Sequence, residues 1–256
     1  MKEYLELIED KLDSVLRAAG DRPRILTEAM RYAVGSGGKR VRPLICLAAA
    51  EAVGGRREDA IYPACAVEFL HNYTLVHDDL PSMDNDRVRR GAQTVWVKFG
   101  EANAILVGDA LQALAFAAAA KAPVKAAEIV STLAAKGVGV VQGQVEDVAA
   151  TGGNEADEFI YLHKTADLFV AAAVMGGYAG GGTAGDIEAL EEFAVALGLA
   201  FQYEDDLLDG DGLCSREETV RRAADFTARA LAALERLPGN KEPLAKIARE
   251  LLGRKA

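Results

Sequence analysis

Residues 71–91 read HNYTLVHDDLPSMDNDRVRRG, and this stretch decides how the rest of the chain is interpreted. Four aspartates fall within nine positions, after an apolar run with helical spacing and before three arginines. Acidic residues beside Asn, Pro and Ser are common in solvated turns, so an ordinary surface loop is one interpretation. The concentration of both charges beside a predicted core favours a second interpretation, a site for a metal ion or a phosphate group.

A second acidic cluster lies far downstream, where residues 201–209 read FQYEDDLLD. Asp205 and Asp209 are four positions apart, so on a helix they share a face about one turn apart. Two like charges at this spacing destabilise a helix unless a cation lies between them. Two such clusters in one chain predict a polynuclear metal centre built across helices.

Composition and periodicity predict an all-α chain. Half of the 256 residues are hydrophobic and only 6% are aromatic, and alanine dominates many segments, which favours helices packed closely through small side chains. No segment has the pattern of a strand, and no repeat or linker divides residues 1–256, so we expect one domain. The helices are expected from the N-terminus to near residue 20 and at about 24–34, 44–53, 60–80, 103–120, 122–148, 155–176, 187–208, 217–237 and 243–252.

Charge and cysteine content exclude several classes of protein. The formal net charge of −10 argues against an unspecific nucleic-acid binder. Cys46, Cys65 and Cys214 are widely spaced, which predicts neither a disulfide framework nor a CxxC metal site and favours a reducing cytoplasm. The N-terminal segment lacks the apolar core of a signal peptide. Asp109 and Gln112 interrupt the most apolar segment, so no stable membrane insertion is expected.

Other segments carry charge where a helix or a turn would need an anion. Residues 35–43 read GSGGKRVRP, a glycine-rich turn followed by three cations, which is either a helix connection or an anion site. It is not a Walker A loop, because Ala33 and Arg40 stand where that motif needs Gly and Ser or Thr. Glu68 and His71 form the Glu-x-x-His pair of di-iron bundles, but the chain has no second pair.

These motifs, taken together and in this order, resemble the trans-polyprenyl diphosphate synthases, the family of short-chain farnesyl and geranylgeranyl diphosphate synthases. The resemblance runs from about Gly35 to Asp209. It rests on GGKRVRP at 37–43, HDDLPSMD at 77–84 followed by RRG at 89–91, the Gly143-Gln144 pair with Asp147, HKT at 163–165, and residues 201–209. The family implies a single-domain helical bundle of the isoprenoid synthase type with a central active-site cavity.

The resemblance also implies a reaction. An allylic diphosphate, dimethylallyl or geranyl, loses pyrophosphate, and the double bond of isopentenyl diphosphate attacks the resulting carbocation. Mg²⁺, expected as three ions with bound diphosphate, suits a departing pyrophosphate because it prefers oxygen ligands. By resemblance, the metal ligands are Asp78, Asp79, Asp84, Asp205 and Asp209.

The remaining site residues also follow from the resemblance. Arg89 and Lys164 would contact the allylic diphosphate, and Thr165 and Gln202 would place oxygen dipoles near the carbocation. Isopentenyl diphosphate would be bound by Lys39, Arg42, His71 and Arg90. The family also implies a homodimer.

Tyr73 and Thr74 are expected to set product length. They lie one turn before Asp78, where the family places the floor of a hydrophobic tunnel for the growing chain. A bulky aromatic residue five positions before the motif resembles the bacterial farnesyl type, so we expect a fifteen-carbon product. A geranylgeranyl diphosphate synthase, a catalytically silent subunit of a heteromeric synthase and a class I terpene cyclase are the alternatives. The cyclase would have no use for an isopentenyl diphosphate site.

The chain departs from the family at two places. Gln93 and Trp96 stand where the family usually has Pro and His, which we expect to affect local packing. After Asp209 the family continues into a lid loop that carries a further cation, whereas here Gly210-Asp211-Gly212 leads almost directly into the next helix. Either the protein has lost its lid after residue 212, or the sequence omits a mobile loop, since lids are mobile until ligand binds.

Overall fold

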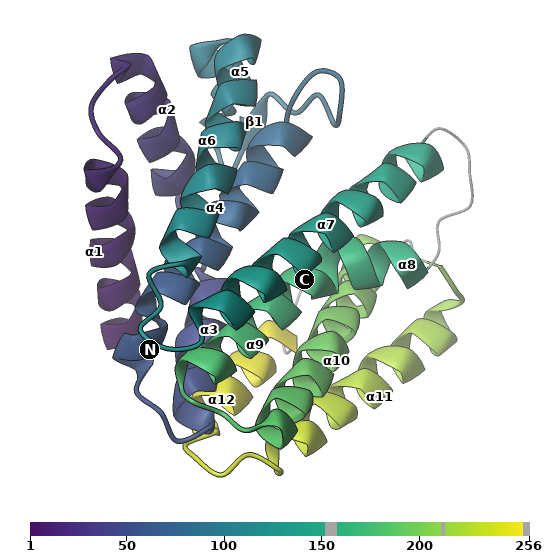
Figure 1. Cartoon of the computed structure of the whole chain (residues 1–256). Coiled ribbons are helices and arrows are strands. Elements are labelled where there is room, and N and C mark those ends of the chain that lie inside the picture. Colours follow the sequence, from purple (N-terminus) through teal and green to yellow (C-terminus); the bar gives the residue numbers. More distant parts are fainter. Residues whose placement is uncertain (152–157, 211–212, 253–256) are drawn as a thin grey trace.

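The computed structural model describes residues 1–151, 158–210 and 213–252, and nearly all of their elements are helices (Figure 1). The elements in chain order are α1 (Lys2–Ala18), α2 (Arg24–Gly35), α3 (Val41–Ala52), η1 (Arg57–Ala60), α4 (Ile61–Asp78), β1 (Val88–Arg89), β2 (Ala92–Gln93), α5 (Val95–Phe99), α6 (Glu101–Ala119), α7 (Ala126–Thr151), α8 (Glu158–Ile160), η2 (Tyr161–Ala166), α9 (Asp167–Ala179), α10 (Ala184–Asp209), α11 (Arg216–Leu234) and α12 (Glu242–Leu252).

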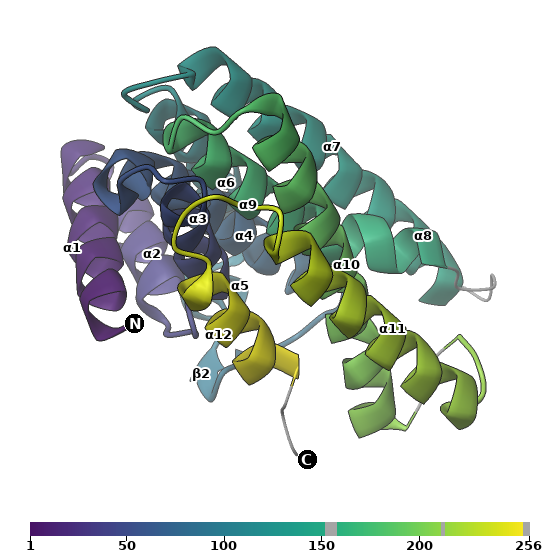
Figure 2. The same ribbon diagram turned by 90° about the horizontal axis from the view of Figure 1, so that it is seen from below.

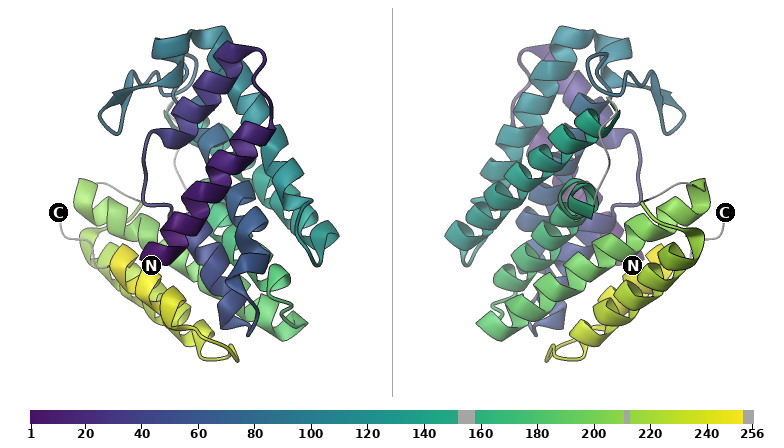
Figure 3. Two further views of the ribbon diagram at one scale, coloured as in Figure 1. Left: turned by 90° about the vertical axis from the view of Figure 1, so that its left-hand side faces the viewer. Right: turned by 90° about the vertical axis from the view of Figure 1, so that its right-hand side faces the viewer.

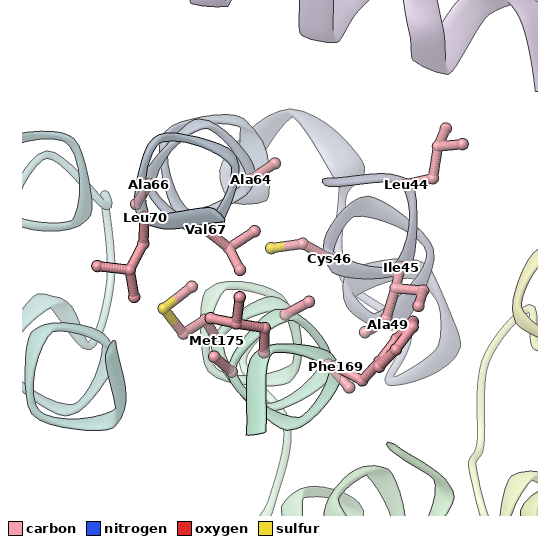
Figure 4. Packing of buried hydrophobic residues seen from close by; sticks show 14 of the residues in the cluster. Leu44, Ile45, Cys46, Ala49, Ala64, Ala66, Val67, Leu70, Phe169 and Met175 are labelled. Atoms are coloured by element: carbon pink, nitrogen blue, oxygen red, sulfur yellow. The ribbon is translucent and has the colours of Figure 1, made fainter. Parts of the chain in front are cut away.

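Helices α3, α4 and α9 form the centre of the molecule. They are apolar on nearly all sides, which is the pattern of helices buried in a core. Small residues bring their axes close, because a Cβ added to Gly176 of α9 would lie 2.1 Å from the backbone oxygen of Cys46. Figure 4 shows Cys46, Val67, Phe169 and Met175 from these helices packed together. The alanine-rich composition therefore serves close helix packing, as expected.

The other helices surround this centre. Helices α1 and α2 lie at one side, and α10 and α11 pack on each other at the opposite side (Figures 1 and 2). The C-terminal α12 returns across the base to contact α3 and α11 (Figure 3). The all-α prediction is confirmed.

Most helix ends lie within a few residues of the predicted ones, and two of the differences affect the site. Helix α3 begins at Val41 rather than Leu44, because Pro43 is tolerated in the first turn of a helix, where backbone N–H groups have no partner within the helix. Helix α4 ends at Asp78, two residues before the predicted end at Leu80. The earlier end leaves the residues after Asp78 free to turn back toward the helix.

The prediction that no segment is a strand is wrong for one short hairpin. Strands β1 and β2 pair antiparallel, with Val88 opposite Gln93 and Arg89 opposite Ala92. The turn residues Arg90 and Gly91 both have positive φ, at 54° and 79°, as a tight two-residue hairpin turn requires. Two residues per strand are too few for an alternating pattern to be visible in the sequence.

Among the described residues, two helical segments are long and apolar enough to cross a membrane, whereas no such segment was expected. They are Glu101–Ala119 and Glu158–Ala179. The buried share of the most apolar 18-residue stretch is 39% in the first segment and 72% in the second. The second is a core helix of the bundle. The first leaves apolar side chains such as Ile105 and Leu106 exposed, and such a helix is weak evidence for a membrane span.

Candidate active site

A cavity of about 550 Å³ lies between α4, α7 and η2, and we call it the aspartate cavity. Seven of its lining residues are predicted site residues: Arg42, His71, Tyr73, Thr74, Asp78, Lys164 and Thr165. The structure therefore brings residues from three predicted motifs, far apart in the sequence, around one space.

The first aspartate cluster begins where α4 ends. Asp78 is the last helical residue, and its backbone oxygen accepts a hydrogen bond from the N–H of Asp84 at 2.9 Å, which folds the loop back. The pKa of Asp78 is raised from 3.8 to about 6: burial is the largest cause, the negative charges of Asp84 and Asp79 add to it, and Lys164 and Arg89 oppose it. A raised pKa means that the ionised carboxylate is under-compensated, so this site favours a cation.

Asp79 points away from the cavity toward Arg89. The Nε of Arg89 lies 2.6 Å from Oδ1 of Asp79, which is 4% exposed, and Nη2 of Arg89 lies 3.2 Å from Oδ2 of Asp86. Burial raises the pKa of Asp79, and the pairing with Arg89 opposes that rise. Arg89, predicted to contact the allylic diphosphate, is thus held by two aspartates in this structure.

Lys164 and Thr165 lie on η2, a single π-helical turn between α8 and α9. Such turns are frequent at functional sites, because the wider turn changes the direction of side chains. Nζ of Lys164 lies 2.5 Å from Oδ2 of Asp147 on α7, and Oγ1 of Thr165 donates to Oε1 of Gln202 at 3.0 Å. Gly143 permits this arrangement, since a Cβ there would lie 2.3 Å from the backbone nitrogen of Lys164.

The second aspartate cluster lies at the end of α10. Asp206 is buried and its Oδ2 accepts a hydrogen bond from the hydroxyl of Tyr161 at 2.6 Å, so it supports the packing of η2 on α10. Asp205 is half-buried one position earlier, one turn after Gln202. The side chain of Asp209 lies outside the described residues.

The described residues contain no group of three or more His, Cys, Asp or Glu side chains placed to hold a metal ion together. The donor set nevertheless fits Mg²⁺, which takes carboxylate oxygens and keeps waters and phosphate oxygens as its other ligands. The under-compensated charge at Asp78 points the same way. A metal ion bound here would take carboxylate oxygens from this cluster.

A second cavity, of about 640 Å³, adjoins the first and shares Arg42 and His71 with it. We call it the cation pocket, because it is also lined by Lys39, Arg40 and Arg90. Nη1 of Arg42 lies 3.3 Å from Nε2 of His71, and Nε of Arg42 is buried without a hydrogen-bond partner among the described residues. Burial lowers the pKa of Arg42 to about 10, and burial and the neighbouring arginines lower the pKa of His71 well below its usual value. His71 is therefore neutral at pH 7, and Arg42 has no acidic partner among the described residues.

Arg40 belongs to the same loop but has a structural role. It has a positive φ of 49° and is 4% exposed, and its guanidinium reaches Glu68 at 2.7 Å and Glu9 at 2.7 Å. Glu68 also accepts a bond from the amide of Asn72. Because Glu68 is committed to Arg40 and Asn72, the Glu-x-x-His pair does not form a di-iron site in the described residues.

Sequence reasoning missed the partners of several predicted residues. Asp147 was noted without a role, and Tyr161 gave no signal beyond its place beside the predicted His-Lys-Thr motif. Trp96, which departs from the family, donates its indole N–H to the backbone oxygen of Asp86 at 2.7 Å and so fixes the loop after the first cluster. This is the local packing effect that was expected.

The fold and the site define an all-α protein with the isoprenoid synthase fold, and the comparisons give its family. The family model for polyprenyl synthetase matches residues 23–247. The chain therefore belongs to the polyprenyl synthetase family.

Two plant relatives show the family at the level of sequence. The large subunit 1 of a heterodimeric geranylgeranyl pyrophosphate synthase from Arabidopsis thaliana is 48% identical over 220 residues, which are 80% of this chain and 58% of the relative. The geranylgeranyl pyrophosphate synthase of Capsicum annuum is 48% identical over 198 residues, 73% of this chain and 54% of the relative. The chain thus spans little more than half the length of these relatives.

Solved structures match over nearly their whole length. An apo FPP/GFPP synthase from Zymomonas mobilis has a TM-score of 0.89 and 33% identity, with 98% of each chain covered. A geranyltransferase from Legionella pneumophila has a TM-score of 0.91 and 29% identity, covering 99% of this chain and 96% of the other. The isoprenoid synthase fold is confirmed.

Proposed function

We propose that the protein is a short-chain prenyl diphosphate synthase that condenses isopentenyl diphosphate with an allylic diphosphate. The observation that carries this proposal is a pair of adjoining cavities, one that begins at the first aspartate cluster and one lined by Lys39, Arg40 and Arg90, which share Arg42 and His71. An enzyme that joins two diphosphates needs two anion sites whose substrates meet. The cation pocket suits isopentenyl diphosphate, through Lys39, Arg42, His71 and Arg90, and the aspartate cavity suits the allylic partner.

The residues of the aspartate cavity have distinct roles in this proposal. Asp78, Asp79 and Asp84, with Asp205 and Asp209 from the other cluster, would hold Mg²⁺, which would supply positive charge against the charge of the departing pyrophosphate. Lys164 and Arg89 would exchange their present carboxylate partners for the diphosphate oxygens. Such charge-assisted contacts act most strongly where negative charge develops in the transition state.

The reaction itself breaks the allylic C–O bond, and the electron pair leaves with pyrophosphate. The double bond of isopentenyl diphosphate then forms the new C–C bond, and the proton lost in the final elimination goes to pyrophosphate. Thr165 and Gln202, joined at 3.0 Å, would direct oxygen dipoles at the carbocation. The valines and leucines of the cavity, such as Val140 and Leu168, would exclude water from it.

Geranylgeranyl diphosphate is the product that the relatives favour, since the curated relatives named above are geranylgeranyl pyrophosphate synthases. Farnesyl diphosphate is the second candidate, and Tyr73 favours it because its ring lines the cavity one to two turns below Asp78. The catalytically silent subunit is the third. Arg42 argues against a silent subunit. Its Nε is buried without a hydrogen-bond partner among the described residues, and a buried charged group without a binding role costs stability.

We also propose that a second chain covers the exposed apolar face of α6, which includes Ile105 and Leu106. A homodimer accounts for this face without membrane insertion. One relative is named as the large subunit of a heterodimer, so a heteromeric partner is the alternative. Sedimentation of the purified chain at several concentrations distinguishes a self-associating chain from a monomer that awaits a partner.

The proposed function is tested by incubating the protein with Mg²⁺, isopentenyl diphosphate and dimethylallyl or geranyl diphosphate. We expect release of pyrophosphate and products of fifteen or twenty carbons, with Asp78→Asn as the inactive control. Absence of pyrophosphate release from a folded dimer would support the silent subunit instead. The intact mass of the protein decides the open question of the lid, since a mass matching 256 residues eliminates an omitted loop.

A further inference from the structure

A buried group of charged side chains beside the aspartate cavity has no role in the reaction described above. Asp167, the first residue of α9, is only 2% exposed. Nζ of Lys136 on α7 lies 3.1 Å from its Oδ1, and Nδ1 of His163 on η2 lies 2.7 Å from its Oδ2. A carboxylate paired with an ammonium group accepts hydrogen bonds but has none to donate, so Nδ1 of His163 carries the proton. We call these three residues the Asp167 cluster.

One face of α7 leaves room for this cluster. Four residues at three- or four-residue spacing lie on that face: Lys136, Gly139, Gly143 and Asp147. A Cβ on Gly139 would overlap Oδ2 of Asp167 and would lie 3.3 Å from Nδ1 of His163. The two glycines therefore let η2 and the start of α9 approach α7 closely.

Two ion pairs join η2 and α9 to α7, one on each side of the glycines. Asp147 of α7 pairs with Lys164 at 2.5 Å, and Lys136 of α7 pairs with Asp167 at 3.1 Å. The first pair belongs to the aspartate cavity, where Lys164 would exchange Asp147 for a diphosphate. When that exchange occurs, the pair at Asp167 is the one of the two that still joins this segment to α7.

We propose that Asp167 is a positioning residue, which holds the π-helical turn in place while Lys164 changes its partner from Asp147 to the allylic diphosphate. This inference rests on the proposed function. The bond from His163, inside the turn, to Asp167, directly after it, spans the end of the turn, and Lys136 ties that bond to α7. Small displacements of a group that positions a substrate have large effects, so the anchor of the turn affects how well Lys164 meets the diphosphate.

Asp167→Asn and Lys136→Met test this role from the two sides of the ion pair. Each removes one charge with little change in volume, and Lys136→Met disturbs folding less because that side chain is 26% exposed. The Kd of geranyl diphosphate with Mg²⁺, measured by calorimetry, should rise about three- to tenfold, the range expected when one charge-assisted contact is weakened. The Kd of isopentenyl diphosphate measured without metal should stay unchanged, because no residue of η2 lines the cation pocket. A merely structural loss would lower the fraction of protein that binds and leave both Kd values unchanged.

Glu191→Gln is the matched control, because Glu191 is an exposed acid 3.8 Å from Nζ of the same Lys136. Both Kd values should equal those of the unmodified protein. An unchanged Kd of geranyl diphosphate in Asp167→Asn and Lys136→Met, or an equal rise for both substrates, overturns the role of Asp167. An unmodified protein that binds geranyl diphosphate without condensing it overturns the proposed function alone, and one that does not bind it overturns both, so the two failures are distinguishable.

Discussion

The aspartate cavity and the cation pocket adjoin each other but differ in how their charged side chains are paired. Beside the first aspartate cluster, two cations have acidic partners: Lys164 pairs with Asp147, and Arg89 pairs with Asp79 and Asp86. In the cation pocket the acid among the described lining residues, Glu68, is bound to Arg40, and Arg42 lies beside a neutral His71. The cluster therefore holds its cations through carboxylates, whereas the pocket presents Lys39, Arg42 and Arg90 beside one acid that Arg40 already pairs with.

This difference in charge pairing indicates which of the two sites would need a metal ion to bind a diphosphate. A pocket with unpaired cations binds a diphosphate directly, whereas a site of carboxylates repels one until divalent cations reverse its charge. In the proposed reaction, the substrate that loses pyrophosphate would therefore bind beside the metal, and the substrate that keeps its diphosphate would bind to the arginines.

The largest effect is expected from a substitution in the first aspartate cluster. Asp78→Asn should lower kcat about 10²–10³-fold, the size expected for loss of one electrostatic contact to developing charge. The KM for isopentenyl diphosphate should remain within about twofold, because that substrate is bound by the other pocket. Steady-state kinetics at saturating Mg²⁺ measures both, and Asp225→Asn on the surface of α11 is the control. A large change in the KM for isopentenyl diphosphate would contradict the division of roles.

The next largest effect is expected from a substitution in the cation pocket. Arg42→Gln removes a charged group expected to contribute about 1.5–3 kcal/mol, so the KM for isopentenyl diphosphate should rise about ten- to a hundredfold. The KM for the allylic substrate should change much less. Since Arg42 also stacks on Phe169, with 5.0 Å between the guanidinium carbon and the ring centroid, melting curves must show that the variant is folded. Arg24→Gln, at an exposed pair with Glu28, is the matched control. Equal effects on both substrates would argue for one undivided site.

A smaller effect concerns how the acidic half is held in place. Gly143→Ala introduces a Cβ only 2.3 Å from the backbone of η2, which should cost about 1–3 kcal/mol and displace Lys164. The free energy of unfolding in denaturant measures the cost. Gly35→Ala serves as control, because its Cβ meets nothing within 4 Å. An unchanged Gly143→Ala protein would show that α7 and η2 adjust freely.

The smallest expected effect is the pH dependence of stability that Asp78 causes. The pKa of Asp78 is raised from 3.8 to about 6 in the folded protein, so its ionised form destabilises the fold. Asp78→Asn should therefore stabilise the metal-free protein at pH 7 by about 1–3 kcal/mol. The gain should fade as the pH falls through 6 and vanish below 3.8, where the native carboxyl is protonated in both states. Melting temperatures in chelator between pH 4 and 8 test the sign, and destabilisation at pH 7 would refute it.

Much of this fold follows from local patterns in the sequence. Glycine and proline mark the helix ends near Gly20, Pro23 and Gly210 because they disfavour continuation of a helix. The type of nearly every element was predictable for this reason. The hairpin at 88–93 was not, since it depends on Arg90 adopting a positive φ that its side chain does not favour.

The candidate site was predicted as a set of residues rather than as an arrangement. The motifs indicated Asp78, Lys164 and Arg42 as single residues. The pairing of Lys164 with Asp147 and the contact of Arg42 with His71 depend on helices that approach each other only in the folded chain. The π-helical turn at 161–166 likewise follows from packing against Gly143, and no local pattern indicates it.

The sequence by itself determined the helical class, the residue types of the two acidic clusters and the order of the motifs, because these depend on local spacing and on the chemistry of single side chains. Only the tertiary structure decided which cations are already paired and that Arg42 and His71 belong to both cavities. These facts depend on distances between separate helices, and burial rather than residue type sets the charge that each group carries.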